Sequence, residues 1–447
     1  MTQFIIFIGW TGILMIEGFC IATLIARITD FKQRLALALP CAALSNVLIL
    51  FLNTVIHVPL KPAVLLLEHT LVVITIFFAQ KNVRLILVQP CKESTTMNTK
   101  IVRSFCRTIL LISLLFSFSH AVLLPSYQID SFTNWTMRSK ISFYDHSIAF
   151  DTDESRGMAK PQYPILVHSL QIIVNEGNRE WNDHSANAIL WLLTLSYFTA
   201  LFLLLQRLRG TDVSLLAVTL LISTPLLGFH LAVQYGDIHL VTMLLLSLAA
   251  LLLWLEEKNM SWLSLSALFV TASVWTKSEG LIVGLLPWLC LIALLCRTSN
   301  KITVVSWHLA ILSLSFLWPL FLIIRGLGLT PHETDFHIAF HPEGFLQALS
   351  GLFAAGSFGV TWFCLACAML LLTILAYRKD PRVDQTMLLT SLWGLAALVI
   401  VLFTYLFTPN VAFLLSGQSY YRPLMIPVSM LILSCFASWK LDLHKYK

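Results

Sequence analysis

The chain has 447 residues, of which 57% are hydrophobic and only 12% are charged, and its formal net charge is +6. Soluble proteins carry about twice this share of charged residues. The composition therefore excludes a soluble globular protein and predicts an integral membrane protein. The basic residues lie mainly in short hydrophilic gaps and form no tract with interleaved aromatic residues, which argues against a nucleic-acid partner.

Hydrophobic runs recur along the chain at close to the length of about 20 residues that a membrane-crossing helix needs. They begin near residues 4, 34, 62, 108, 188, 213, 238, 261, 280, 303, 348, 386 and 422. We therefore predict an all-α polytopic protein with about 13 spans, of which the run at 261–275 is the weakest. No basic region precedes the first run, so we interpret it as a retained span rather than a cleaved signal peptide.

The basic residues are divided unequally between the two sets of alternating gaps. If the N-terminus lies outside, 20 of the 29 Lys and Arg residues fall in cytoplasmic gaps, six of them in the segment 80–107. Five of the other nine lie in one long polar loop, where the charge rule is weak. This bias predicts a non-cytoplasmic N-terminus, non-cytoplasmic polar loops and a cytoplasmic C-terminus.

The large polar loop, at about 126–187, follows only the fourth hydrophobic run. We therefore predict an N-terminal three-helix membrane appendage at 1–107 and a main membrane module at 108–447, which contains this loop. None of the nine cysteines lies in a large polar loop, so no disulfide framework is indicated. Cys364 and Cys367 form a CxxC inside an apolar run, where packing explains them better than metal or redox chemistry.

The start of the large loop contains a candidate catalytic carboxylate. Asp130 directly follows the fourth run, and Trp135, Arg138 and Lys140 follow it at short spacings. A carboxylate at the membrane boundary near cations suits a general base that faces an anionic lipid-linked donor. The alternative is that Asp130 caps an interfacial helix while the basic side chains contact lipid headgroups.

Other charged residues lie at predicted outer helix ends. Lys277 and Glu279 could contact and orient a donor phosphate, or they could pair with each other at the interface. Arg422 could bind phosphate through several donors, or it could anchor the last helix together with its neighbouring tyrosines. Asp237, beside Tyr235, is a candidate for binding the acceptor or the sugar. The histidines near the outer face match no zinc template.

Four motifs in order resemble the GT-C superfamily of membrane glycosyltransferases, in particular bacterial members related to protein mannosyltransferases and aminoarabinose transferases. The first is D-x4-W-x2-R-x-K from Asp130 to Lys140, and the second is Tyr163-Pro164-Ile165-Leu166. The third and fourth are Gln234-Tyr235-Gly236-Asp237 and Thr276-Lys277-Ser278-Glu279-Gly280. The resemblance covers about residues 108–440.

The resemblance implies an inverting glycosyltransferase of the bacterial inner membrane, with a polyprenyl-phosphate sugar as donor at the outer leaflet. It implies Asp130 as the catalytic base and leaves a glycan, a lipid or a protein as acceptor. Substrate-binding residues would be Trp135, Arg138, Lys140, Tyr163, Asp237, Lys277, Glu279 and Arg422.

The sequence departs from the family pattern because no second acidic residue adjoins Asp130. The acidic cluster Asp151-Thr152-Asp153-Glu154 lies in the same loop and would suit Mg²⁺ or Mn²⁺. An exposed acidic run is more often simply solvated, so we predict no metal site.

Two other functions remain open at this point. A lipid or glycan transporter usually shows repeat symmetry and polar or broken helices at mid-membrane, whereas here the ionisable residues cluster at the outer boundary. A non-catalytic envelope-assembly protein with the same fold would be distinguished by substitution of Asp130.

Overall fold

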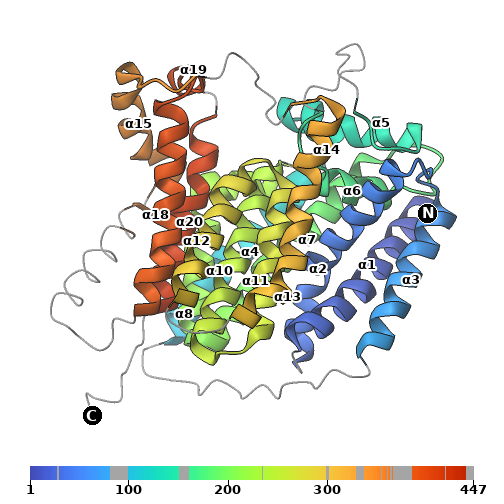
Figure 1. Cartoon of the computed structure of the whole chain (residues 1–447), viewed down its shortest axis with the longest axis horizontal. Coiled ribbons are helices and arrows are strands. Elements are labelled where there is room, and N and C mark those ends of the chain that lie inside the picture. Colours follow the sequence, from blue (N-terminus) through green and yellow to red (C-terminus); the bar gives the residue numbers. More distant parts are fainter. Residues whose placement is uncertain are drawn as a thin grey trace.

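The computed structural model is a bundle of helices of unequal length (Figure 1). Its described residues contain no strand, which confirms the predicted all-α class. These residues are 1–27, 30–80, 99–150, 161–233, 235–297, 302–328, 337–353, 355–359, 361–362, 365, 385–417 and 419–438. The Cys364–Cys367 pair and the acidic cluster at 151–154 lie outside them.

Three helices form the N-terminal part of the bundle: α1 (Thr2–Ala26), α2 (Phe31–Val55) and α3 (Pro62–Gln80). Helix α2 is largely buried, because it packs against α1 on one side and against the helices α6, α7 and α11 described below on the other. Glu17 of α1 and His69 of α3 are fully buried and pair with each other, as polar groups inside a membrane must. The N-terminal helices are thus in close contact with the rest of the protein.

The next helix, α4 (Thr99–Ala121), continues through residues 107 and 108. The predicted division at this point would therefore fall within a helix, and two separable domains remain a prediction. The polar loop after α4 forms a π-helical turn, η1 (Ser131–Thr136), and two short helices, α5 (Met137–Asp145) and α6 (Leu166–Ile173). Helix α7 (Asp183–Arg209) then returns the chain through the bundle.

The centre of the bundle is α10 (Gly236–Glu257), which is almost wholly buried between α7, α11 (Met260–Thr276) and the last helix. Before it, α8 (Thr211–Ser223) and α9 (Pro225–Ala232) meet at an angle of 76°. Pro225 occupies the first turn of α9, where it needs no backbone donor but cannot continue α8. The hydrophobic run predicted as one span near 213 is therefore a broken helix.

The remaining helices complete the bundle and its upper rim in Figure 1. They are η3 (Gly280–Leu285), α12 (Leu286–Arg297), α13 (Ile302–Ser313), η4 (Leu314–Phe316), α14 (Leu317–Arg325), η5 (Pro342–Gly344), α15 (Phe345–Leu352), α16 (Ala355–Phe358), α18 (Gln385–Leu406), α19 (Val411–Leu415) and α20 (Tyr421–Ser438). The short helices α15 and α19 lie at the same edge of the molecule as α5 (Figure 1).

Seven helices within the described residues are long and apolar enough to cross a membrane, or eight if α8 and α9 form one span. Four shorter apolar helices add to these: Met260–Thr276, Gly280–Leu294, Ser391–Leu406 and Tyr421–Ala437. The first of these corresponds to the run expected to be weakest. The predicted total of about 13 spans remains a prediction.

Glu176, directly after α6 in the polar loop, gives a pH-dependence prediction. Its carboxyl is buried, and burial raises its pKa from 4.5 to about 8. Between these two values the folded protein keeps a proton that the unfolded chain releases, so stability falls as pH rises. We expect the thermal midpoint in detergent to fall by several degrees from pH 5 to pH 8.5. Glu176→Gln should flatten this dependence, and an unchanged slope in the variant would contradict the assignment.

Candidate active site

Five charged residues predicted from the sequence meet at one end of the bundle, where they form an ion-pair network. Each lies at the end of a helix, and they come from four separate regions of the chain. They are Asp130 before η1, Asp237 in the first turn of α10, Lys277 and Glu279 between α11 and η3, and Arg422 in the first turn of α20.

Asp237 is the centre of the ion-pair network because it contacts both cations. The Lys277 Nζ atom lies 3.0 Å from Asp237 Oδ1 and 3.0 Å from Glu279 Oε1. The Arg422 Nη1 atom contacts Asp130 Oδ2 and lies 3.5 Å from Asp237 Oδ2. Burial by itself lowers the pKa of Lys277, but Asp237 and Glu279 raise it above its ordinary value, so the ammonium stays charged.

The helix ends explain part of this arrangement. A carboxylate is favourable at a helix N-terminus and a cation at a helix C-terminus, as for Asp237 on α10 and Lys277 after α11. The helix dipole does not favour Arg422, because this cation lies at the N-terminus of α20. The ion pairs with Asp130 and Asp237 therefore stabilise Arg422 at this position. Its guanidinium comes from the first turn of α20.

The ion-pair network is buried on one side and open on the other. The side chains of Asp237 and Lys277 are 5% and 9% exposed, whereas that of Glu279 is 35% exposed. Both hydrogen bonds of Arg422 to described residues use Nη1, so its Nε and Nη2 retain donors for a ligand. The ion-pair network contains three carboxylates and two cations, so its net charge is negative. Binding of an anion here would therefore depend on directed hydrogen bonds from Arg422 rather than on net charge.

A stack of three aromatic rings supports the ion-pair network from the polar loop. The Trp135 ring lies between those of Tyr163 and His168, with centroid distances of 5.3 and 5.5 Å. The Lys277 Nζ atom lies 6.0 Å from the centroid of Tyr163. Burial raises the pKa of Tyr163 to about 12, so its phenol stays protonated at neutral pH. Trp135 is itself buried, so its ring supports the network from inside the protein and is not exposed at the site.

Gly236 sets the distance between this stack and Asp237. A Cβ atom at Gly236 would clash with the edge of the Trp135 ring at Cη2, and the tryptophan has no open space to move into because its side chain is buried. Gly236→Ala should therefore destabilise the protein by about 1–3 kcal/mol through overpacking, seen as a lower thermal midpoint. Gly12→Ala is the matched control, since no atom lies within 4 Å of its Cβ. Equal midpoints for the two variants would show that the contact at Gly236 is not tight.

Arg138 and Lys140 lie apart from the ion-pair network. Arg138 is fully buried, and its guanidinium donates to the carbonyl oxygens of Ala149 at 3.0 Å and Tyr163 at 2.6 Å. These bonds hold the backbone of Tyr163, which favours a positioning role for Arg138 over direct contact with substrate. Lys140 is half-buried on α5 and forms no ion pair with a described residue.

Two contacts at the site were not predicted from the sequence. Asn134 donates a hydrogen bond from Nδ2 to Asp130 Oδ1, and the i, i+4 spacing of the two residues could have indicated this contact. The guanidinium of Arg422 lies 5.2 Å from the ring centroid of Tyr235. Tyr235 belongs to a motif recognised in the sequence, but the local pattern alone does not predict that Arg422 covers it.

No group of three or more His, Cys, Asp or Glu side chains among the described residues is arranged to hold a metal ion. The acidic cluster at 151–154, which would suit Mg²⁺ or Mn²⁺, lies outside these residues. The described residues at the site therefore offer ion pairs and hydrogen-bond donors rather than a set of metal ligands.

No protein-family model and no curated protein matches this chain by sequence. Two solved structures have a similar fold, both of ArnT from Cupriavidus metallidurans. The form bound to undecaprenyl phosphate has a TM-score of 0.54 and 12% identity, and the match covers 75% of this chain and 60% of that one. The apo form has a TM-score of 0.53 and 13% identity, with 76% and 59% covered.

The chain thus spans about 60% of the length of the ArnT structures that it matches. ArnT is an aminoarabinose transferase with the GT-C fold, so the fold predicted from the four sequence motifs is confirmed. At this level of identity the similarity concerns the fold alone.

Proposed function

We propose that this protein is an inverting membrane glycosyltransferase that transfers a sugar from a polyprenyl-phosphate donor, with Asp130 as the general base. The observation that carries the proposal is the contact between Asp130 and Arg422 at the open side of the ion-pair network. It combines an acceptor for a proton with a donor for a phosphate at one place, on a fold similar to that of ArnT.

In the proposed reaction, an acceptor hydroxyl attacks the anomeric carbon of the sugar while Asp130 takes its proton. The bond between the anomeric carbon and the acceptor oxygen forms as the bond to the phosphate oxygen breaks, and the polyprenyl phosphate departs with the electron pair. Attack from the face opposite the leaving group inverts the anomeric configuration. One carboxylate is enough for this step because the leaving group is already an anion.

Binding of the donor phosphate would rest on the guanidinium of Arg422. Two donor atoms of Arg422, Nε and Nη2, remain available for this contact. Lys277 would add charge from beneath, held in place by Asp237 and Glu279. That one ArnT structure contains undecaprenyl phosphate supports a polyprenyl lipid as the partner. The half-open position of Glu279 suits an acceptor or sugar hydroxyl.

We place the ion-pair network on the non-cytoplasmic side of a bacterial inner membrane. Helix α10 supports this orientation because its C-terminal end pairs with basic residues of a gap that the charge bias assigns to the cytoplasm. Its N-terminus carries Asp237, whereas Glu256 and Glu257 at its C-terminus pair with Arg209 and Arg207. The C-terminal side is thus one of the basic faces expected in the cytoplasm.

The test uses purified protein in lipid with a panel of radiolabelled polyprenyl-phosphate sugars, and it follows loss of label from the carrier. We expect one donor to be consumed, which would also identify the sugar. The acceptor, whether glycan, lipid or protein, follows from where the label goes. If no donor is consumed but lipid moves across the bilayer, the protein is a transporter and the proposal fails.

A further inference from the structure

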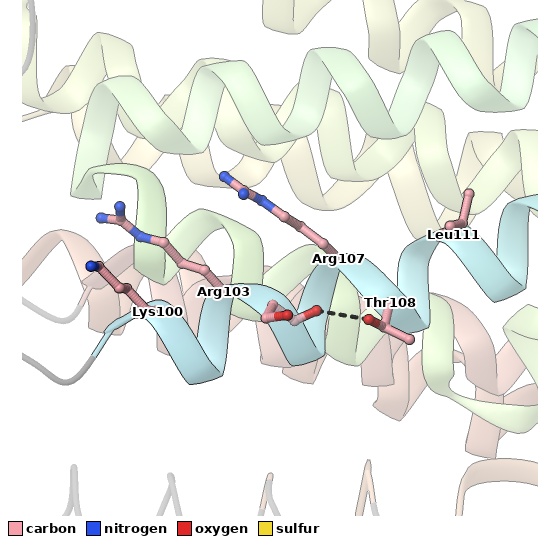
Figure 2. A pocket seen from close by; sticks show the side chains of 6 residues that line it. Lys100, Arg103, Arg107, Thr108 and Leu111 are labelled. Atoms are coloured by element: carbon pink, nitrogen blue, oxygen red, sulfur yellow. Dashed lines mark hydrogen bonds between the residues drawn. The ribbon is translucent and has the colours of Figure 1, made fainter.

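A second site candidate lies at the other end of α4, far from the ion-pair network. A pocket of about 370 Å³ is lined by Lys100, Arg103, Ser104, Arg107, Thr108 and Leu111. Figure 2 shows the side chains that line it. Lys100, Arg103, Arg107 and Leu111 follow one another at intervals of three or four residues, so they lie along one face of the helix. We call this the basic pocket.

Arg103 and the other two cations have different surroundings. Arg103 donates to Asp212 of α8 through Nε and Nη2, the latter at 3.2 Å, and so ties the two helices together. Lys100 and Arg107 lie on either side of it and are exposed. The neighbouring hydroxyls of Ser104 and Thr108 add polar groups to the wall. The Thr108 hydroxyl donates to the Ser104 carbonyl oxygen at 3.0 Å, so the basic pocket offers two cations and the Ser104 hydroxyl to an anion. Arg103 and Asp212 hold this place in position.

An apolar groove begins where the basic pocket ends. It encloses about 350 Å³ between α4, α7 and α8, and Leu111 lines both the groove and the basic pocket. The groove continues past Leu114 of α4 and reaches Phe198 and Thr199 of α7. Positive charge followed directly by an apolar channel is complementary to one molecule that has a phosphate at one end and a hydrocarbon chain at the other.

We infer that α4, α7 and α8 form a binding site for one anionic phospholipid. Its headgroup phosphate would lie against Lys100 and Arg107, and one acyl chain would occupy the apolar groove. Charge at the membrane surface attracts acidic lipids, and burial of the chain adds a hydrophobic contribution.

This site is separate from the proposed transfer reaction. Helix α4 has 23 residues, and at about 1.5 Å per residue its two ends are about 35 Å apart. The chain enters the polar loop with Asp130 only after the far end of α4. The site would therefore be on the opposite membrane surface, and it does not depend on the proposed function.

The experiment measures binding of dioleoyl phosphatidylglycerol to delipidated protein in detergent by native mass spectrometry. We expect one lipid to bind preferentially over dioleoyl phosphatidylcholine. The variant Lys100→Gln/Arg107→Gln should bind it about 10- to 30-fold more weakly, from the loss of two charges near the headgroup. The control Lys61→Gln/Arg179→Gln removes two exposed charges elsewhere and should bind within twofold of wild type.

A third variant tests the apolar groove with all charges intact. Thr199 lines the groove and is exposed, so Thr199→Trp should block the chain and weaken binding at least fivefold. Excess inorganic phosphate should not displace the lipid. Equal binding of the two lipids, or wild-type affinity in either Lys100→Gln/Arg107→Gln or Thr199→Trp, would overturn the inference, as would full displacement by phosphate. Thermal midpoints close to that of wild type would show that each variant is folded.

Discussion

Asp130→Asn should reduce sugar transfer by about 10²- to 10⁴-fold, the usual contribution of a positioned general base. Asn has the same shape and can still accept the hydrogen bond from Asn134, but it cannot take a proton from the acceptor. Arg422 keeps its contact with Asp237, so the donor-binding cation should stay in place. Single-turnover measurement of label leaving the carrier gives the rate, and a lipid-binding titration gives the donor affinity separately.

The matched control is Glu180→Gln, which removes an exposed carboxylate from the same polar loop. We expect it to retain the rate of the wild type. If Asp130→Asn turns over as fast as the wild type, Asp130 is not the base, and the acidic cluster at 151–154 becomes the candidate. If the wild type consumes a donor and Asp130→Asn binds it with unchanged affinity but does not react, the base assignment is supported.

Lys277→Met should lower the free energy of unfolding by about 3 kcal/mol, because it leaves the buried carboxylate of Asp237 without its closer cation. Among the described residues, the other ion pair of Asp237 is with Arg422 at 3.5 Å, and Arg422 also contacts Asp130. Since 9% or less of either side chain is exposed, water can compensate little of this loss. Thermal unfolding in detergent, followed by circular dichroism, should show a fall of several degrees in the midpoint.

A double variant distinguishes loss of charge compensation from loss of packing. Asp237→Asn/Lys277→Met removes both members of the pair and should recover much of the stability lost in Lys277→Met. Lys258→Met at the opposite end of α10 removes an exposed lysine and should change the midpoint little. No recovery in the double variant would mean that Lys277 stabilises the fold through its packing, and that its pair with Asp237 contributes little.

Much of the architecture follows from the sequence because lipid imposes a simple requirement. Backbone polar groups in hydrocarbon must be satisfied within the helix, so long apolar runs indicate helices wherever they occur. The same reasoning places Asp130 and Arg422 at helix ends, since charged groups are costly at mid-membrane. The motif order also predicts a GT-C fold, which the similarity to ArnT confirms.

Local sequence patterns were less informative about breaks within helices and about the contacts that support the candidate active site. The run near 213 looks like one continuous span, but Pro225 turns the chain by 76° within it. Arg138 has the residue type and spacing of a phosphate ligand, yet its guanidinium is fully buried and bound to two backbone carbonyls. The direction of a side chain depends on the packing of the loop around it, and neighbouring residues do not encode that packing.

The sequence by itself determined the class of the protein, its membrane environment and the charged residues that lie at helix ends. Only the tertiary structure decided which of these residues meet. Asp130 and Arg422 are 292 positions apart, and Asp237 and Lys277 are 40 apart. Their contacts depend on how α10, α11 and α20 pack side by side. Hydrophobic periodicity says that these helices are buried, but the choice of neighbours comes from the complementary shapes and charges of distant segments.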